Sequence, residues 1–207
     1  MGWAAYARDS SFVAAWLEAL RDTSMVHINP FGARYVAESK QTLAFVQEPA
    51  FATHFTPDER DLVSTLLPYA RKLTSDAPAP ALDDSAHGES LIEHVLQNQR
   101  DWVVKEPYDI RGDGVTIGFD ASRSLWRAAV ERGVRGGHIV QRRVVPTSYP
   151  VVSAGSDRVE VMNISLDTYL FGGKVAGFGS KASSNAKVNV FQGGQKLAVH
   201  VVSREDS

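Results

Sequence analysis

The sequence predicts an α+β fold in which helices come first and a mixed, mostly antiparallel sheet follows. Two observations lead to this prediction. Apolar residues recur at helical spacing in the first part of the chain, whereas short β-rich runs joined by glycine turns fill the last part. The chain has 207 residues, of which 43% are hydrophobic and 22% charged. That length and composition suffice for a buried core, so we expect a globular protein and not a disordered one.

The first third of the chain carries the helix signals. The segments with helical spacing are residues 10–21, 38–46 and 57–67. The third has the clearest start, because Thr56 can cap it, Pro57 suits its first position and Glu59 can act as the reciprocal cap. Pro68 is expected to disturb its end. A short buried strand is expected at residues 25–30, where Pro30 stops it.

The remainder of the chain predicts most of the sheet. Residues 74–88 are rich in Pro, Ala, Asp and Ser without periodicity, which is typical of a linker. Helices are expected at 89–98 and 122–133. The expected strands are 102–105, 115–119, 138–145, 159–171, 174–181, 186–191 and 196–202.

The predicted elements divide the chain into three parts. A helical lead occupies residues 1–74 and a linker occupies 75–88. The sheet region, 89–207, is expected to contain two subdomains, 89–150 and 151–207.

Composition excludes several classes of protein. Lys and Arg total 22 against 24 Asp and Glu, so the basic excess expected of a nucleic-acid-binding protein is absent. There is no cysteine, which removes disulfides, thiol catalysis and cysteine-ligated metals. Arg8 and Asp9 interrupt any signal-peptide core, and no uncharged run reaches the roughly 18 residues of a membrane span. We expect a soluble, cytoplasmic protein that binds neither nucleic acid nor membrane.

The most informative stretch for chemistry is residues 101–120. A strand delivers Lys105 at its end, and Gly112 and Gly114 then shape a turn into the next strand. Backbone N–H groups of such a turn can cradle an anion, and a lysine beside it suits phosphate. The pattern is neither a Walker A loop nor a dinucleotide fingerprint. The alternative is a plain glycine-rich hairpin with a surface lysine.

A second glycine-rich stretch closes the chain. Asn189 stands on an expected strand just before Gly193 and Gly194, and its amide can both donate and accept hydrogen bonds. Taken alone, this stretch is also consistent with an ordinary β-turn.

In this order the motifs resemble the ATP-grasp superfamily, and specifically its circularly permuted branch, which includes glutathionylspermidine synthase-like enzymes. Residues 28–46 resemble the family's Asn-Pro turn and Ser-Lys helix start, which places Lys40 as the first nucleotide lysine. Residues 101–107 resemble the strand-ending Lys-Pro element, which places Lys105 as the second, although a glutamate intervenes here. Residues 111–118 resemble the flexible glycine loop over the phosphates.

Two further stretches extend the resemblance toward the C-terminus. Residues 138–144 are similar to the hinge strand that receives adenine, with Gln141 and the backbone from Arg142 to Val144 at the base edge. Residues 174–195 resemble the closing element. There the resemblance implies that Lys181, where the family commonly has Arg, and Asn189 face the γ-phosphate or the acyl acceptor.

The resemblance implies an ATP-grasp-like fold, with two subdomains around a nucleotide cleft, ATP and Mg²⁺ as cofactors, and a ligase that joins a carboxylate to an amine through an acylphosphate. Lys40 and Lys105 would contact phosphates, and Gly112 and Gly114 would make the lid mobile. Asp167 is a candidate carboxylate near the metal, although a solvent-facing strand aspartate is an equal alternative.

The acidic magnesium element of permuted members lies upstream of the Asn-Pro turn, where this chain has only 26 residues or so. We therefore expect a C-terminal portion of a longer protein. Two alternatives remain open, a non-catalytic ATP-grasp remnant that acts as a scaffold and an unrelated α+β interaction domain.

Overall fold

The computed structural model describes residues 9–22, 36–79, 90–109 and 112–202. The chain forms two compact units, Met1–Ala37 and Glu38–Ser207. The described element of the first unit is helix α2, Ser10–Asp22, which confirms the helix expected at 10–21. The side chain of Asp9 caps it by accepting the backbone N–H groups of Ser11 at 3.0 Å and Phe12 at 3.2 Å. The strand and Asn-Pro turn expected at 25–30 lie outside the described residues.

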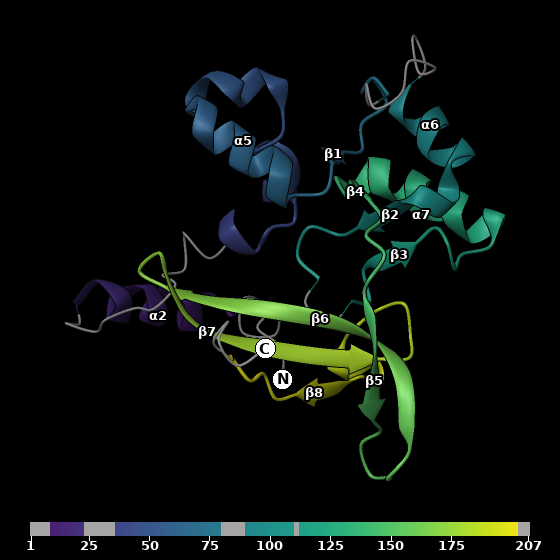
Figure 1. Ribbon diagram of the computed structural model, residues 1–207. Coiled ribbons are helices and arrows are strands. Elements are labelled where there is room, and N and C mark those ends of the chain that lie inside the picture. The colour runs from purple at the N-terminus through teal and green to yellow at the C-terminus, as the bar shows by residue number, and fades with distance from the viewer. Residues whose placement is uncertain (1–8, 23–35, 80–89, 110–111, 203–207) are drawn as a thin grey trace. The chain divides into compact units, whose positions relative to one another are not determined.

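The second unit is α+β and contains two four-stranded sheets, whose strands are labelled in Figure 1. The first sheet has the order β1-β4-β2-β3, with strands Ala70–Lys72, Ile139–Arg142, Trp102–Lys105 and Val115–Ile117. The second has the order β5-β6-β7-β8, with strands Ser148–Val152, Val159–Phe171, Lys174–Ser183 and Gln195–Leu197. Every strand pairing in the described part of the chain is antiparallel, so the mixed pairing that we expected is not seen there.

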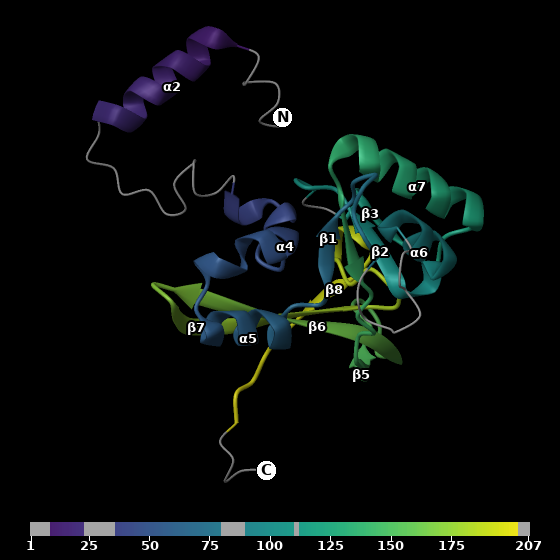
Figure 2. The same cartoon turned by 90° about the horizontal axis from the view of Figure 1, so that it is seen from above.

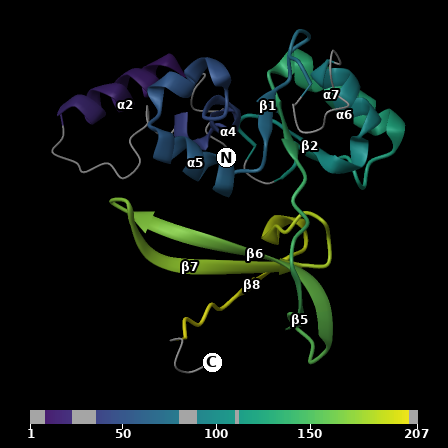
Figure 3. The same ribbon diagram turned by 45° about the horizontal axis from the view of Figure 1, so that its top comes forward.

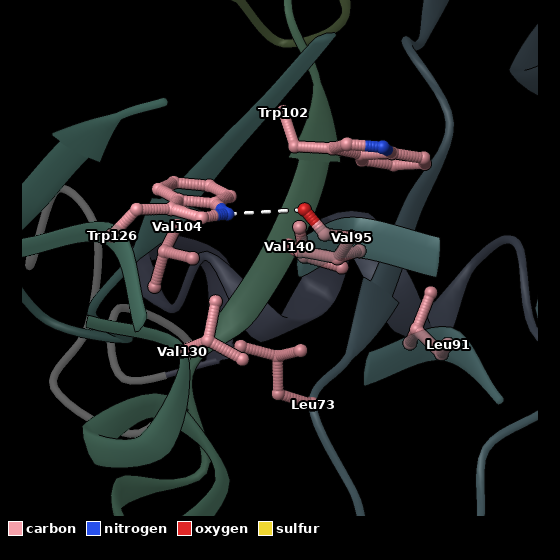
Figure 4. Close-up of a cluster of buried hydrophobic side chains, with 8 residues drawn as sticks. All are labelled: Leu73, Leu91, Val95, Trp102, Val104, Trp126, Val130 and Val140. Atoms are coloured by element: carbon pink, nitrogen blue, oxygen red, sulfur yellow. Dashed lines mark hydrogen bonds between the residues drawn. The ribbon is translucent and has the colours of Figure 1, made fainter. Parts of the chain in front are cut away.

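Two helices pack beside the first sheet, as Figure 2 shows: α6, Leu91–Gln97, and α7, Arg123–Gly136. The main hydrophobic core joins them to the sheet (Figure 4). Its buried side chains are Leu73, Leu91, Val95, Trp102, Val104, Trp126, Val130 and Val140. Because side chains alternate between the faces of a strand, Trp102 and Val104 of β2 enter this core whereas Val103 and Lys105 face the other way.

One end of that opposite face is covered by a helix. Helix α4, Gln41–Phe45, contributes Ala44, which is buried against Ala70 of β1 and Ile139 of β4. The face next to β2 and β3 carries the site described below.

The second sheet is built around a long hairpin, and Figure 3 shows β6 and β7 as its long strands. The hairpin turns at Gly172 and Gly173, whose φ angles are +55° and +76°. These left-handed conformations favour glycine. A smaller core of Val151, Met162 and Ala182 holds one face of this sheet.

The local signals around α5, Pro57–Leu66, are confirmed. The hydroxyl of Thr56 accepts the Glu59 N–H at 3.3 Å, and the Glu59 carboxylate accepts the Thr56 N–H at 2.8 Å. Helix α6 begins with the same capping box, formed by Ser90 and Glu93. A 3₁₀ helix, η1, Pro49–His54, precedes α5, and another, η2, Gln99–Asp101, precedes β2.

Two expected strands are wrong or incomplete, and two observed strands were not predicted. Residues 186–191 form no strand: they bend, and then enter a 3₁₀ helix, η3, Val190–Gln192. The reason is local, because the Asn189 side chain accepts the Phe191 N–H at 2.8 Å and so caps that turn. The strand expected at 196–202 is only the short β8. Strands β1 and β5 were not expected.

Part of the segment expected to be a linker is structured. Ala77 packs against the main core, and Pro78 forms an isolated antiparallel bridge with Ser90. Residues 80–89 lie outside the described part of the chain. Among the described residues, no helix combines the length and apolar character that a bilayer-crossing segment needs.

Candidate functional site

A cavity of about 290 Å³ lies against the face of the first sheet that α6 and α7 leave free. The three adjacent strands β3, β2 and β4 supply its floor. The floor residues are Val103, Lys105, Val115, Ile117 and Gln141. Gly112, Arg142, Val144 and residues 186–189 complete the lining. The volume is near the lower end of the range of ligand pockets, about 300 to 1,000 Å³.

Strand pairing explains why these floor residues meet. Val103 lies opposite Ile117 on one side of β2 and opposite Gln141 on the other, whereas Lys105 lies opposite Val115. Directly opposed residues on antiparallel strands project to the same face. The floor therefore combines branched apolar side chains with one ammonium and one amide.

Lys105 is the polar centre of the floor. Its ammonium donates a hydrogen bond to the side-chain oxygen of Gln141, which is only 7% exposed. Burial lowers the pKa of Lys105, and the positive charge of Lys40 lowers that pKa further. A cation in this environment would be stabilised by an anion, which would supply the opposite charge that the described residues do not.

Lys40 does not line the cavity, although its positive charge lowers the pKa of Lys105, which does. It precedes α4, and its backbone N–H donates to the carbonyl of Pro107 at 2.9 Å. Its ammonium donates to the backbone carbonyl of Asp109. The loop that follows β2 therefore binds Lys40 near enough to Lys105 for the two charges to interact.

The two glycines of the predicted loop have different positions. Gly112 lines the cavity with a φ angle of +80°, which favours glycine. Gly114 does not line it. A Cβ at Gly114 would lie 2.8 Å from the side chains of Glu106 and Asp109, so this glycine permits close packing of the turn.

The turn at Gly112 is bonded to the C-terminal segment. Lys187 donates from its ammonium to the Gly112 carbonyl at 3.0 Å, and Gln192 donates from its amide to the Asp113 carboxylate at 2.9 Å. Lys187 also lines the cavity, and sequence reasoning missed it. No local signal identifies it, because its contact with Gly112 spans 75 residues.

The hinge after β4 offers fewer backbone groups than we expected. The N–H of Arg142 donates to the Tyr69 carbonyl at 2.8 Å, and that of Arg143 donates to the Asp101 carbonyl at 2.7 Å. The Val144 N–H makes no hydrogen bond with any described residue. Of the predicted base-edge N–H groups, only that of Val144 therefore remains available to a ligand.

Arg142 and Asn189 line the cavity, but parts of both side chains are engaged in the protein. The guanidinium of Arg142 lies 5.7 Å from the centre of the Trp102 ring and 3.9 Å from the Asp101 carboxylate. The side-chain oxygen of Asn189 caps η3, whereas its amide nitrogen would lie 3.6 Å from a Cβ at Gly112. The amide of Asn189 thus points toward the glycine turn.

Gly193 and Gly194, the glycine pair after Asn189, determine the path of the backbone and do not line the cavity. Gly193 has a φ angle of +87° and ends η3. A Cβ at Gly194 would lie 2.8 Å from the carbonyl oxygens of Ala182 and Asn189. The close approach that these glycines permit is therefore to the protein's own backbone.

Lys181 and Asp167 lie on the second sheet and do not line the cavity. Their side chains form an ion pair with a distance of 2.5 Å between Nζ and Oδ2. Both are about one-third exposed. The structure therefore brings these two predicted residues to each other, and not to Lys105.

The described residues offer magnesium no prepared site. They contain no group of three or more His, Asp or Glu side chains placed to hold a metal ion. The one predicted metal carboxylate, Asp167, is paired with Lys181. In contrast, the cavity suits a ligand with a flat apolar part and an anionic part, because it joins branched apolar side chains to two lysines.

No protein-family model matches the chain, and no curated protein matches it either.

Proposed function

We propose that the unit Glu38–Ser207 binds ATP in the cavity on the first sheet, as the nucleotide-binding part of an ATP-grasp ligase. The observation that supports this most is the partly buried ammonium of Lys105, which interacts with a second lysine at one end of an apolar floor. The cavity is lined by six residues that the sequence predicts as nucleotide or catalytic residues: Lys105, Gly112, Gln141, Arg142, Val144 and Asn189.

The apolar part of the cavity suits adenine. Val103, Val115 and Ile117 form one wall, and Val144 and Val188 also contribute branched side chains. A base between such side chains buries both of its apolar faces. The N–H of Val144 is free to donate to a ring nitrogen at the edge of the base.

The polar part suits phosphate. Lys105 and Lys187 both reach the cavity, and Lys40 adds its charge from nearby. A bound phosphate would raise the pKa of Lys105 again, because an opposite charge favours the ammonium form. The ammonium of Lys187 has three N–H donors, so it can donate to a phosphate oxygen while it keeps its bond with the Gly112 carbonyl.

The proposed reaction has two steps. An oxygen of the acid substrate attacks the γ-phosphorus of ATP, and ADP leaves, which gives an acylphosphate. The amine then attacks the acyl carbon and loses a proton, the phosphate leaves with the bonding electron pair and takes up that proton, and an amide forms. The lysines of this unit would offset the negative charge that gathers on the transferring group.

A second candidate is an ATP-binding module without ligase activity. One specific observation favours it, namely that the described residues present no carboxylate cluster for magnesium.

The test is equilibrium binding of a fluorescent ATP analogue and its displacement by ATP. Lys105→Ala should weaken binding at least tenfold, because it removes a charged hydrogen bond worth about 1.5–3 kcal/mol. Lys174→Ala is the matched control, since Lys174 is an exposed lysine of β7 outside the cavity. Equal affinity in all three proteins, or no binding to the folded wild type, would refute the proposal. Phosphate release on mixing ATP with carboxylic acids and amines would distinguish the ligase from the module.

A further inference from the structure

A second hollow, of about 1,060 Å³, lies where α6 ends and α7 begins. Three of its lining residues are arginines from two elements: Arg100 of η2, and Arg123 and Arg127 of α7. Asp101 is the one acidic residue in the lining, and its carboxylate lies 3.9 Å from Arg142. We call this hollow the arginine groove.

The positions of Arg123 and Arg127 oppose the local rules of helix stability. They stand in the first two turns of α7, whose first turn contains no acidic residue. The N-terminal end of a helix carries partial positive charge, so cations are unfavourable there. Like charges four residues apart on a helix also repel one another. Places where a sequence departs from such rules are often functional.

The third arginine is fixed in place by an aromatic ring. The guanidinium groups of Arg100 and Arg143 both lie over the ring of Phe119, each 4.2 Å from its centre. Phe119 itself lines the groove. A guanidinium that stacks on a ring keeps its in-plane N–H groups available for paired bonds to an oxyanion.

Within the described part of the chain, no ion pair neutralises the charges of Arg100, Arg123 and Arg127. The whole chain carries a net charge of −2, so this positive concentration contrasts with the rest of the protein. A concave surface with one sign of charge attracts the opposite ion.

We propose that the arginine groove binds a small ligand with several oxyanion groups, which are phosphates or carboxylates. The stacked Arg100 and the two α7 arginines would each donate to a different oxygen of that ligand. This proposal does not depend on the proposed ATP site, because the residues that line the two hollows do not overlap.

The test is calorimetric titration of the full chain with inorganic tripolyphosphate and, separately, with citrate. We expect Arg123→Gln and Arg127→Gln each to weaken binding about tenfold. Arg135→Gln is the matched control, because it removes the same charge from the last turn of the same helix, outside the groove. Binding at the groove by that variant and by Lys105→Ala should stay within about twofold of the wild type. Tighter binding of tripolyphosphate identifies phosphate as the source of the oxyanions, and tighter binding of citrate identifies carboxylate.

Three results would overturn the proposal. The first is that neither anion binds to the folded wild type. The second is that Arg135→Gln weakens binding as much as Arg123→Gln. The third is that Lys105→Ala removes binding, which would locate the anion in the other cavity. Displacement of the anion by a single-stranded oligonucleotide at lower concentration would assign the groove to nucleic acid instead. Circular dichroism and thermal unfolding of each variant establish that it is folded, and a second pair, Arg123→Lys and Arg127→Lys, should retain part of the affinity.

Discussion

Two buried tryptophans of one cluster differ in a single hydrogen bond, and that difference predicts unequal mutants (Figure 4). Trp126 is 1% exposed, and its indole N–H donates to the carbonyl of Val95 at 3.0 Å. Trp102 is fully buried, and its indole nitrogen has no hydrogen-bond partner among the described residues. The substitution Trp→Phe removes the same atoms at both positions, so the loss of apolar volume is similar.

The expected difference follows from these contacts. Trp126→Phe breaks a hydrogen bond worth about 0.5–1.5 kcal/mol, whereas Trp102→Phe removes a buried donor whose desolvation costs about 1–3 kcal/mol. We therefore expect Trp126→Phe to have a free energy of unfolding about 2 kcal/mol lower than Trp102→Phe. With a urea dependence of about 2 kcal/mol per molar, the two midpoints should differ by about 1 M.

The assay is urea unfolding followed by far-ultraviolet circular dichroism, because that signal does not depend on the replaced indole. Equal slopes for the two variants would show that the midpoints report stability. If Trp102→Phe proves as unstable as Trp126→Phe, or less stable, the packing described for this core is wrong.

Three further predictions concern the ligand-free protein. Burial and a neighbouring lysine lower the pKa of Lys105, so its ammonium destabilises the fold at pH 7, and this penalty fades as pH rises from the lowered pKa toward 10.5. Lys105→Met should therefore have a higher free energy of unfolding than the wild type at pH 7. Urea unfolding should show that this difference in free energy shrinks at alkaline pH, and a difference that grows would contradict the expected effect of the lowered pKa. Ser90→Ala removes the cap of α6 and should lower the unfolding free energy by about 1 kcal/mol in the same assay; an unchanged midpoint would argue against the cap. Gly118→Ala would place a Cβ 1.9 Å from a backbone oxygen of η2, so we expect thermal unfolding to show a loss of about 3 kcal/mol in the free energy of unfolding. The control Gly155→Ala, whose Cβ has no atom within 4 Å, should lose about 1 kcal/mol. Equal losses in the two variants would refute the contact.

Elements with strong local signals were predictable from the sequence. The capping box of Thr56 and Glu59 marked the start of α5, and the alternating residues of β6 gave that strand its observed bounds. Strand β1 was missed because its three residues show no pattern of their own. It exists through its pairing with β4, about 70 residues later in the chain.

Residues 186–191 show where local chemistry overrides pattern. Their alternation of polar and apolar side chains is typical of a strand. The Asn189 cap and the left-handed Gly193 close a 3₁₀ turn there instead. The prediction of a strand therefore assigned the wrong secondary structure to the segment that holds Asn189.

The site was partly predictable for a similar reason. Residue type and spacing predicted Lys105, and the resemblance to ATP-grasp enzymes added Gln141, yet only the register of β2 with β4 shows that their side chains meet. The contact of Lys187 with Gly112 spans 75 residues and has no local signal. Lys181 and Asp167 were selected as separate functional residues, whereas cross-strand geometry pairs them with each other.

The proposed ATP site is tested most directly by thermal unfolding with and without Mg-ATP, on the wild type and on Lys105→Ala. A ligand at 100 times its dissociation constant should add about 2.7 kcal/mol, which raises the Tm of a chain of this size by about 5–10 °C. We predict this shift in the wild type and its loss in a Lys105→Ala protein that still unfolds cooperatively. An unchanged Tm in the wild type, or an equal shift in both proteins, would contradict the assignment of the cavity to ATP.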